Sequence, residues 1–207
     1  MAKTVVQGQN ATFSVVAGPI HPMLPLSYRW LTNGVGIATS SVPFFTFTNC
    51  QANRSVRCNV VNLAGNVNSG TVNLTVLADT DGDGIPDSYE STYPTILNSG
   101  NPADAGLDPD LDTFINLHEY IAGTVPTNGL SYLKLEPLQF LPGDNAILQF
   151  AAVSNRTYSI DFRDTFDSGT WTNLYSIAPA TTNRTLFFTN NFSTPMRSYR
   201  IQIPPTQ

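Results

Sequence analysis

The chain has 207 residues, of which 41% are hydrophobic and only 12% are charged, with a formal net charge of −5. This composition excludes a disordered chain, and its many Gly, Pro, Asn and Thr residues favour a mainly β fold. No apolar run reaches the roughly 18 residues that span a membrane, so membrane insertion is not expected. The ten basic residues are scattered, which disfavours nucleic acid as a partner.

Residues 1–77 are predicted to form the first of two β-sandwiches. Apolar and polar residues alternate in short segments separated by Gly, Pro and Asn. The stretch L-S-Y-R-W and the later V-V-N-L-A-G-N resemble immunoglobulin-like domains of large secreted bacterial proteins. This resemblance implies that Trp30 is the core tryptophan of the domain. The segments expected to be strands include 11–17, 26–31, 44–48, 56–62 and 71–77.

This first domain contains two cysteines and a β-sheet edge that few residues cover. Cys58 is in phase with inward-facing residues and Cys50 ends the preceding segment, so we expect a Cys50–Cys58 disulfide, with two buried free thiols as the alternative. Only seven residues precede the G-Q-N-A-T-F segment, which leaves an edge open to strand addition. Residues 198–203 are the candidate strand for such an edge, in their own domain or in another subunit.

Residues 78–128 contain two loops with the spacing of calcium ligands. Such a loop supplies oxygens from positions 1, 3, 5, 7, 9 and 12, with position 7 acting through its carbonyl and glycine at position 6. In the second loop, Leu111 and Thr113 stand where glycines are common, so it is expected to bend differently or to bind more weakly. The predicted ligands are Asp79, Asp81, Asp83, Ile85, Asp87 and Glu90 in the first loop, and Asp108, Asp110, Asp112, Phe114, Asn116 and Glu119 in the second.

The central segment also holds most of the acidic charge. Residues 79–119 contain ten of the fifteen acidic residues and no Lys or Arg. Because these carboxylates repel one another, a folded segment requires compensating cations, and we expect at least two Ca²⁺ ions. The sequences D-T-D-G-D-G-I-P-D-S-Y-E, D-A-G-L-D-P-D and N-L-H-E-Y-I-A-G-T resemble thrombospondin type 3 and dockerin-like linkers. This resemblance implies calcium ligands at the positions given above.

Residues 129–207 return to alternating β segments and predict the second sandwich. The run R-T-Y-S-I-D-F-R-D-T-F-D-S-G-T-W-T-N-L, followed by R-S-Y-R-I, resembles a small domain at the C-terminus of many secreted bacterial proteins. Asp161, Asp164 and Asp167 recur around a turn, where solvation is favoured over a third metal site. Trp171, Tyr175 and Tyr132 are expected to pack in the core, with a sugar-stacking surface as the alternative.

No catalytic motif is apparent. The only histidines, His21 and His118, lie near no nucleophile or metal-pair spacing, and both are interpreted as structural. We therefore predict a non-enzymatic extracellular protein of two β-sandwiches, the first immunoglobulin-like, joined by a calcium-binding segment of loops and short helices. Extracellular location is inferred from the calcium loops, the two cysteines and the scarcity of lysine. Without a visible signal peptide, the chain is expected to be either a trimmed form of the protein or a mature fragment of a longer precursor.

The predicted function is structural. Calcium would rigidify the connector, and subunits would self-associate through edge strands to form a surface fibre, sheath or adhesive stalk. The alternative is a glycan-binding or spacer module trimmed from a secreted hydrolase or adhesin.

Overall fold

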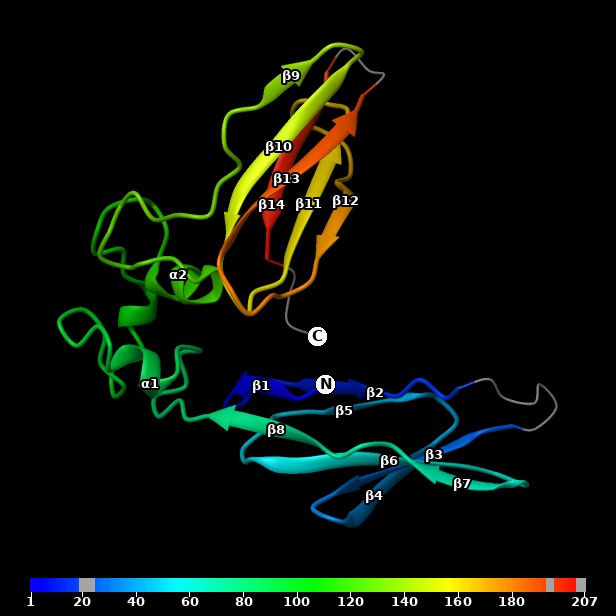
Figure 1. The fold of residues 1–207 in the computed structure, drawn as a ribbon. Coiled ribbons are helices and arrows are strands. Elements are labelled where there is room, and N and C mark those ends of the chain that lie inside the picture. The colour runs from blue at the N-terminus through cyan, green and yellow to red at the C-terminus, as the bar shows by residue number, and fades with distance from the viewer. Residues whose placement is uncertain (19–24, 193–195, 204–207) are drawn as a thin grey trace. The chain divides into compact units, whose positions relative to one another are not determined.

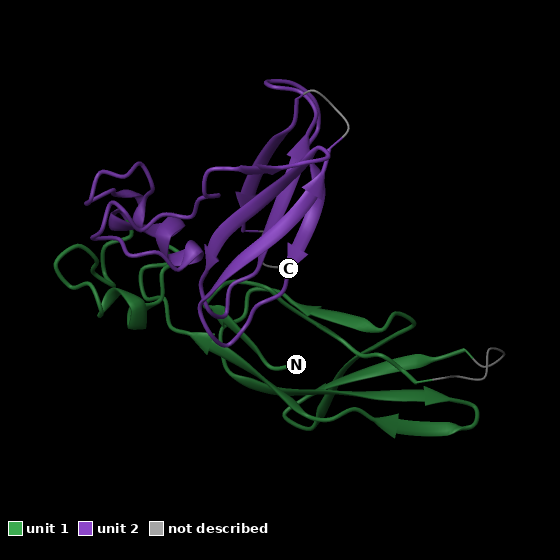
Figure 2. Cartoon of the chain, turned by 45° about the horizontal axis from the view of Figure 1, so that its top comes forward, with its two compact units in different colours: residues 1–102, 206–207 green, residues 103–205 purple. Residues whose placement is uncertain are grey.

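The computed structural model describes residues 1–18, 25–192 and 196–203, and shows the mainly β fold that the composition predicts (Figure 1). The chain divides into two compact units, Met1–Pro102 and Ala103–Pro205 (Figure 2). The division falls inside the predicted connector of residues 78–128, so its first loop belongs to unit 1 and its second loop to unit 2. Each unit is built around its own β-sandwich.

The sandwich of unit 1 consists of a large and a small sheet. The small sheet pairs β2 (Ala11–Ser14) with β5 (Phe44–Phe47). In the large sheet β1 runs parallel to β8, and the other pairings are antiparallel. Its order is β1 (Lys3–Val6), β8 (Val72–Leu77), β6 (Arg54–Asn62), β3 (Ser27–Thr32) and β4 (Val35–Ser40), with β7 (Gly65–Asn68) also paired to β6.

The core of unit 1 lies between these sheets and contains the predicted tryptophan. Trp30 on β3 is 2% exposed and pairs in register with Cys58 on β6. Alternate residues of β2 and β6, among them Phe13 and Val56, face the same core because successive strand side chains point to opposite sides. This strand order and the buried tryptophan confirm the predicted immunoglobulin-like sandwich.

Unit 2 contains two three-stranded sheets packed on a second core. Leu148, Phe150 and Ile160 are fully buried in this core, and the alternation of the sequence in these strands accounts for their inward direction. One sheet has the order β13 (Arg184–Asn191), β10 (Asn145–Ala152) and β9 (Gln139–Leu141). The other has the order β12 (Thr172–Ile177), β11 (Tyr158–Arg163) and β14 (Ser198–Gln202).

The C-terminal segment lies in its own domain. β14 pairs antiparallel with β11, with Ile160 opposite Ile201. Of the two placements left open by the sequence, the structure therefore has the one within the same unit. Residues 204–207 lie outside the described part of the chain.

Helices are short and confined to the predicted calcium-binding segment. Within the described residues, none is long and apolar enough to cross a membrane. They are α1 (Asp87–Glu90) in unit 1, and η1 (Asp104–Gly106) and α2 (Asn116–Ala122) in unit 2.

Candidate metal centres

The first loop begins directly after β8 and ends in α1. The backbone N–H of Asp87 donates to the carbonyl of Ala78 over 2.9 Å, which ties the start of α1 to the end of the strand. Asp79 is buried, and the side chain of Ile85 is fully buried beneath the loop. The loop is therefore anchored to unit 1 at both ends and in the middle.

Backbone hydrogen bonds hold the carboxylates of the first loop inside its turn. Asp79 accepts from the N–H of Gly82 over 2.8 Å through Oδ1 and from that of Gly84 over 3.0 Å through Oδ2. Asp83 Oδ1 accepts from Ile85 N over 2.7 Å. Carboxylate oxygens of Asp79, Asp81 and Asp83 consequently lie within 4.8 Å of one another.

The second loop repeats this pattern. Asp108 accepts from Leu111 N over 2.8 Å and from Thr113 N over 2.9 Å, while Asp112 Oδ1 accepts from Phe114 N over 2.8 Å. Oxygens of Asp108, Asp110 and Asp112 again gather within 4.8 Å. Positions 1, 3 and 5 therefore converge in both loops, as the spacing predicts.

The two departures from glycine do not change the path of the second loop. Leu111 and Thr113 have φ values of 63° and 80°, close to the 78° and 95° of Gly82 and Gly84 at the same positions. Of the two alternatives expected for this loop, a different bend is wrong, and weaker binding stays a prediction. The left-handed conformation costs an L-residue about 1 to 2 kcal/mol, so the second loop carries strain that the first avoids.

Several oxygens of the second loop are buried without a hydrogen-bond donor. Asn116 and Glu119 are 0% and 1% exposed. The amide nitrogen of Asn116 donates to the Asp104 carbonyl over 2.8 Å, which fixes the amide group. Unsatisfied buried oxygens are rare in folded proteins and cost about 1 to 3 kcal/mol each. Here they are both carboxylate oxygens of Asp110, Oδ2 of Asp112, Oδ1 of Asn116 and Oε2 of Glu119.

The electrostatics of Glu119 show how closely these groups approach. Burial, and then the negative charge of Asp110, raise the pKa of Glu119 to about 7, with smaller contributions in the same direction from Asp112 and Asp108. A hydrogen bond from Thr124 acts in the opposite direction. The predicted positions 1, 3, 5 and 12 therefore act on one another in a site that disfavours negative charge.

Not every predicted ligand joins these clusters through its side chain. Both oxygens of Asp87 accept from Thr80, over 2.8 Å from its N–H and 2.7 Å from its hydroxyl, and these bonds lower the pKa of Asp87. Asp87 thus braces the first loop. Glu90, 1% exposed on α1, does bring a carboxylate oxygen within 4.8 Å of an oxygen of Asp83. Phe114, predicted to act through its carbonyl, stacks its ring on Tyr132 with centroids 6.0 Å apart.

The second loop is built into the sandwich of unit 2 through α2. Arg156 donates to the carbonyl of Tyr120 over 2.8 Å, and the hydroxyl of Tyr158 donates to that of Ala122 over 3.4 Å. α2 ends at Gly123, whose φ is 78° and whose N–H donates to Glu119 O over 2.7 Å. A ligand held by the loop would therefore stabilise this end of the sandwich.

Sequence reasoning missed three of these supporting residues, Thr80, Asp104 and Arg156. Asp104 belongs to the acidic segment, but its spacing fits neither loop, and it supports Asn116 through a backbone carbonyl. Gly129 was also overlooked. A Cβ atom at this position would lie 3.0 Å from the carbonyl oxygen of Asp110, so glycine allows the chain to pass close to the second loop.

The predicted disulfide is wrong. Cys50 and Cys58 are free and buried in the core of unit 1, as in the alternative of two buried thiols. The thiol of Cys50 donates to the carbonyl of Phe47 over 3.7 Å, while Cys58 lies within β6 opposite Trp30. Burial raises the pKa of Cys58, which disfavours the reactive thiolate.

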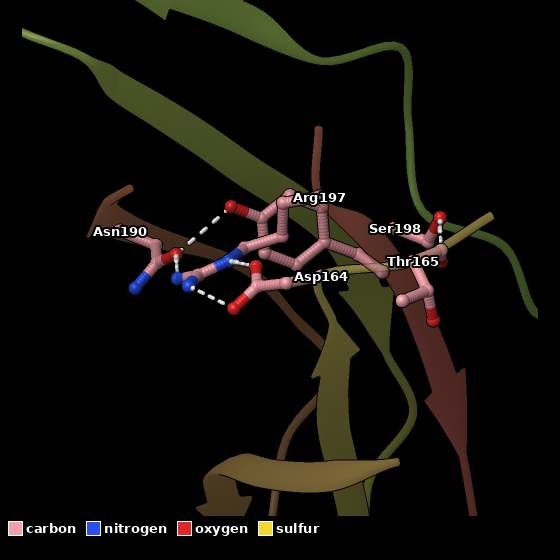
Figure 3. Close-up of polar contacts among 6 residues, drawn as sticks. Asp164, Thr165, Asn190, Arg197 and Ser198 are labelled. Carbon is pink, nitrogen blue, oxygen red and sulfur yellow. Dashed lines mark hydrogen bonds and ion pairs between the residues drawn. The ribbon is translucent and has the colours of Figure 1, made fainter. Parts of the chain in front are cut away.

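The three aspartates around the turn of unit 2 do not form a metal cluster in the described structure. Arg197 makes two hydrogen bonds to Asp164, of 2.6 Å and 2.9 Å (Figure 3). Arg200 pairs with Asp161 over 2.9 Å. Asn190 accepts from both Arg197 and Tyr199, which extends this network. Asp167 is exposed. Ion pairing thus replaces the turn solvation that we expected for Asp161 and Asp164.

The candidate sugar-stacking aromatics already contact other side chains. Guanidinium groups of Arg163 and Arg200 each lie 4.6 Å from the centre of the Trp171 ring. Tyr175 stacks on Phe188 with centroids 4.5 Å apart and packs against the core of unit 2, as predicted. Tyr132 is 37% exposed and stacks on Phe114, so its predicted place in the core is wrong.

His118 is exposed on α2. His21 lies outside the described residues.

No protein-family model and no curated protein matches this chain. Immunoglobulin domains 1–4 of Sidekick-1 are 19% identical, over 37% of this chain and 20% of that chain, with a TM-score of 0.32; a structure of domains 1–5 gives the same values over 16% of its chain. The secreted serine protease VesC from Vibrio cholerae aligns with 95% of this chain and 39% of its own, at 7% identity and a TM-score of 0.15. This chain therefore spans less than half the length of each of these proteins. Any functional conclusion must rest on the two loops themselves.

Proposed function

We propose that the protein is an extracellular, non-enzymatic structural protein stabilised by at least two Ca²⁺ ions, one in each loop. The ligands are those that the spacing predicts, with Asp87 acting through its bracing of the first loop. The observation that carries this proposal is the set of buried, donor-free oxygens on Asp110, Asp112, Asn116 and Glu119.

The donor set fits a hard cation. It consists of carboxylate and amide oxygens, without the sulfur or imidazole that softer metals prefer. A bound Ca²⁺ supplies the positive charge that offsets the repulsion around Glu119. The spacing of both loops supports calcium over Mg²⁺, which demands stricter octahedral geometry and retains more water.

The role of these loops follows from where they are attached. The first loop continues β8, and the second is joined to its sandwich through Tyr120 and Ala122 of α2. Ligand binding would order the end of each sandwich and stiffen the chain between the loops. We propose that such stiffened subunits associate through edge strands into a surface fibre, sheath or stalk. Extracellular calcium, at millimolar levels, matches the dissociation constants of about 10⁻⁴ to 10⁻³ M typical of extracellular modules.

Calcium titration tests the proposal. Chelated protein should bind about two equivalents of Ca²⁺ by calorimetry, and its melting temperature should rise with calcium concentration. Asp110→Asn should remove one equivalent, because it replaces a carboxylate whose two oxygens lack donors. The matched control is Asp167→Asn, which removes one exposed charge outside both loops. Absence of any thermal response up to several millimolar calcium would refute the proposal.

A further inference from the structure

The small sheet of unit 1 has an open strand edge. Within the described residues, β2 pairs with β5 alone. The N–H of Val15 donates to the carbonyl of Pro43 over 2.9 Å. Since antiparallel strands alternate the direction of their backbone groups, those of Thr12 and Ser14 point away from β5. Such a row of unpaired groups is a template for another strand.

A partly apolar groove borders this open edge. It consists of two adjoining hollows of about 740 Å³ and 400 Å³, which share Val15, Val16 and Ser69, and which we call the edge groove. Among the described residues, no charged side chain lines the larger hollow, whereas Lys3 and Arg57 line the smaller one. Val16 and Val67 on its walls are 93% and 71% exposed. Clustered exposed apolar side chains of this kind mark interaction sites.

A buried donor beside the groove also lacks a partner. Trp30 lines the smaller hollow and is 2% exposed, yet its indole N–H has no acceptor in the described structure. Buried indole groups usually donate a hydrogen bond. An added strand offers carbonyl oxygens as well as apolar side chains, whereas a small apolar molecule offers only the latter.

A second strand of the same unit has matching chemistry. β4 ends the large sheet and pairs only with β3 among the described residues (Figure 1). Its sequence, V-G-I-A-T-S, has no charge. Val35 and Ile37 are 66% and 42% exposed. β4 therefore presents both an unpaired backbone edge and exposed apolar side chains, as the edge groove requires of its occupant.

We propose that the edge groove along β2 accepts β4 of a second copy of this chain. The two edges lie on different sheets, so the contact is heterologous, and a pair of joined copies keeps one free β4 edge and one free β2 edge. Repetition of such a contact builds an open, head-to-tail polymer. This inference rests on the assembly part of the proposed function and specifies its interface.

Complementary variants test this interface by sedimentation velocity at millimolar calcium. Val16→Asp blocks the acceptor and Val35→Asp blocks the donor. Each variant alone should remain monomeric at concentrations where the wild type forms higher species, with association weakened at least about tenfold, because an unpaired carboxylate is costly to bury. An equimolar mixture of the two variants should form a two-chain species and nothing larger, since each supplies the edge that the other lacks.

Controls separate the interface from assembly in general. Val67→Asp should repeat the effect of Val16→Asp, and Leu130→Asp, at an 85% exposed site in unit 2, should assemble like the wild type. If both blocking variants still formed the same polymers as the wild type, this interface would be wrong but assembly itself would stand. A wild type that stays monomeric at high concentration would overturn assembly as well. Neither result bears on calcium binding, which is measured on the monomer.

Discussion

The two acidic loops reach the same backbone conformation with different residues. In each loop the aspartate at position 1 accepts N–H bonds from positions 4 and 6, whether these are Gly82 and Gly84 or Leu111 and Thr113. Both pairs have positive φ values. The carboxylate at position 1 therefore organises the turn, and glycine at positions 4 and 6 removes strain without being required for the path of the chain.

The loops differ more in how their oxygens are satisfied. Position 9 of the first loop, Asp87, is engaged by Thr80, whereas position 9 of the second, Asn116, is fully buried with its Oδ1 free of donors. Position 9 is thus a hydrogen-bonded brace in the first loop and a donor-free oxygen in the second, whereas donor-free oxygens at other positions occur in both loops, Oδ2 of Asp81 among them.

Removing the organising carboxylate should have the largest effect. Asp79→Ala should lower the free energy of unfolding of unit 1 by about 3 kcal/mol, because two charge-assisted hydrogen bonds at a buried site are lost. Asp108→Ala should cost unit 2 less without calcium, since Asp108 is only half-buried. Each substitution should also remove one equivalent of bound calcium by calorimetry.

The two tryptophans allow each unit to be followed separately. Trp30 lies in unit 1 and Trp171 in unit 2, so Trp171→Phe leaves a fluorescence signal from unit 1 alone. Asp167→Ala, at an exposed site, controls for the loss of one negative charge. If Asp79→Ala and Asp108→Ala both left the calcium stoichiometry unchanged, the assignment of one ion to each loop would be wrong.

Exchanging the residues at position 6 should change the free energy of unfolding by a smaller amount, with opposite signs in the two loops. Thr113→Gly should stabilise unit 2 by up to about 1 kcal/mol, because relief of left-handed strain exceeds the added entropy of the unfolded chain. Gly84→Thr should destabilise unit 1 by about 1 kcal/mol for the converse reason.

Urea unfolding of both variants, with and without calcium, measures this exchange. Thr113→Gly should also tighten calcium binding to the second loop, because less strain opposes the bound conformation. A Thr113→Gly protein less stable than the wild type would show that the threonine side chain contributes contacts worth more than the strain.

The sequence was sufficient for those features that depend on short, regular patterns. Alternation along β6 placed Val56 and Cys58 in the core, and the acidic spacing brought positions 1, 3 and 5 of each loop together. These features follow from the two-residue period of a strand and from local hydrogen bonding within a turn. Both act over a few residues and need no knowledge of the rest of the fold.

Features that depend on distant neighbours were not accessible from the sequence. The pairing of Asp164 with Arg197 joins residues 33 positions apart, and the contact of Arg156 with Tyr120 joins residues 36 apart. The free thiols of Cys50 and Cys58 depend on the direction of each side chain within the sandwich, which spacing alone does not give. Asp87 stands at position 9 of the first loop, as the spacing predicts. Its hydrogen-bond partner, Thr80, is set by the folded loop and cannot be read from the spacing.

The smallest predicted effect is the pH dependence of the stability of the metal-free protein, which arises from the second loop. Glu119 has an ordinary pKa of 4.5, raised to about 7 in the fold by burial and by neighbouring aspartates. Its protonated form is thus favoured in the folded state, and this contribution is fully present below pH 4.5 and lost as pH rises through about 7. Chelated unit 2 should therefore become less stable over this range.

Glu119→Gln should flatten this pH dependence, since the amide does not titrate. Added calcium should reverse it, because protons then compete with the cation for the same oxygens. Melting curves of Glu119→Gln and wild-type protein across this range, with chelator and with calcium, provide the measurement. An unchanged slope in Glu119→Gln would assign the titration to another group.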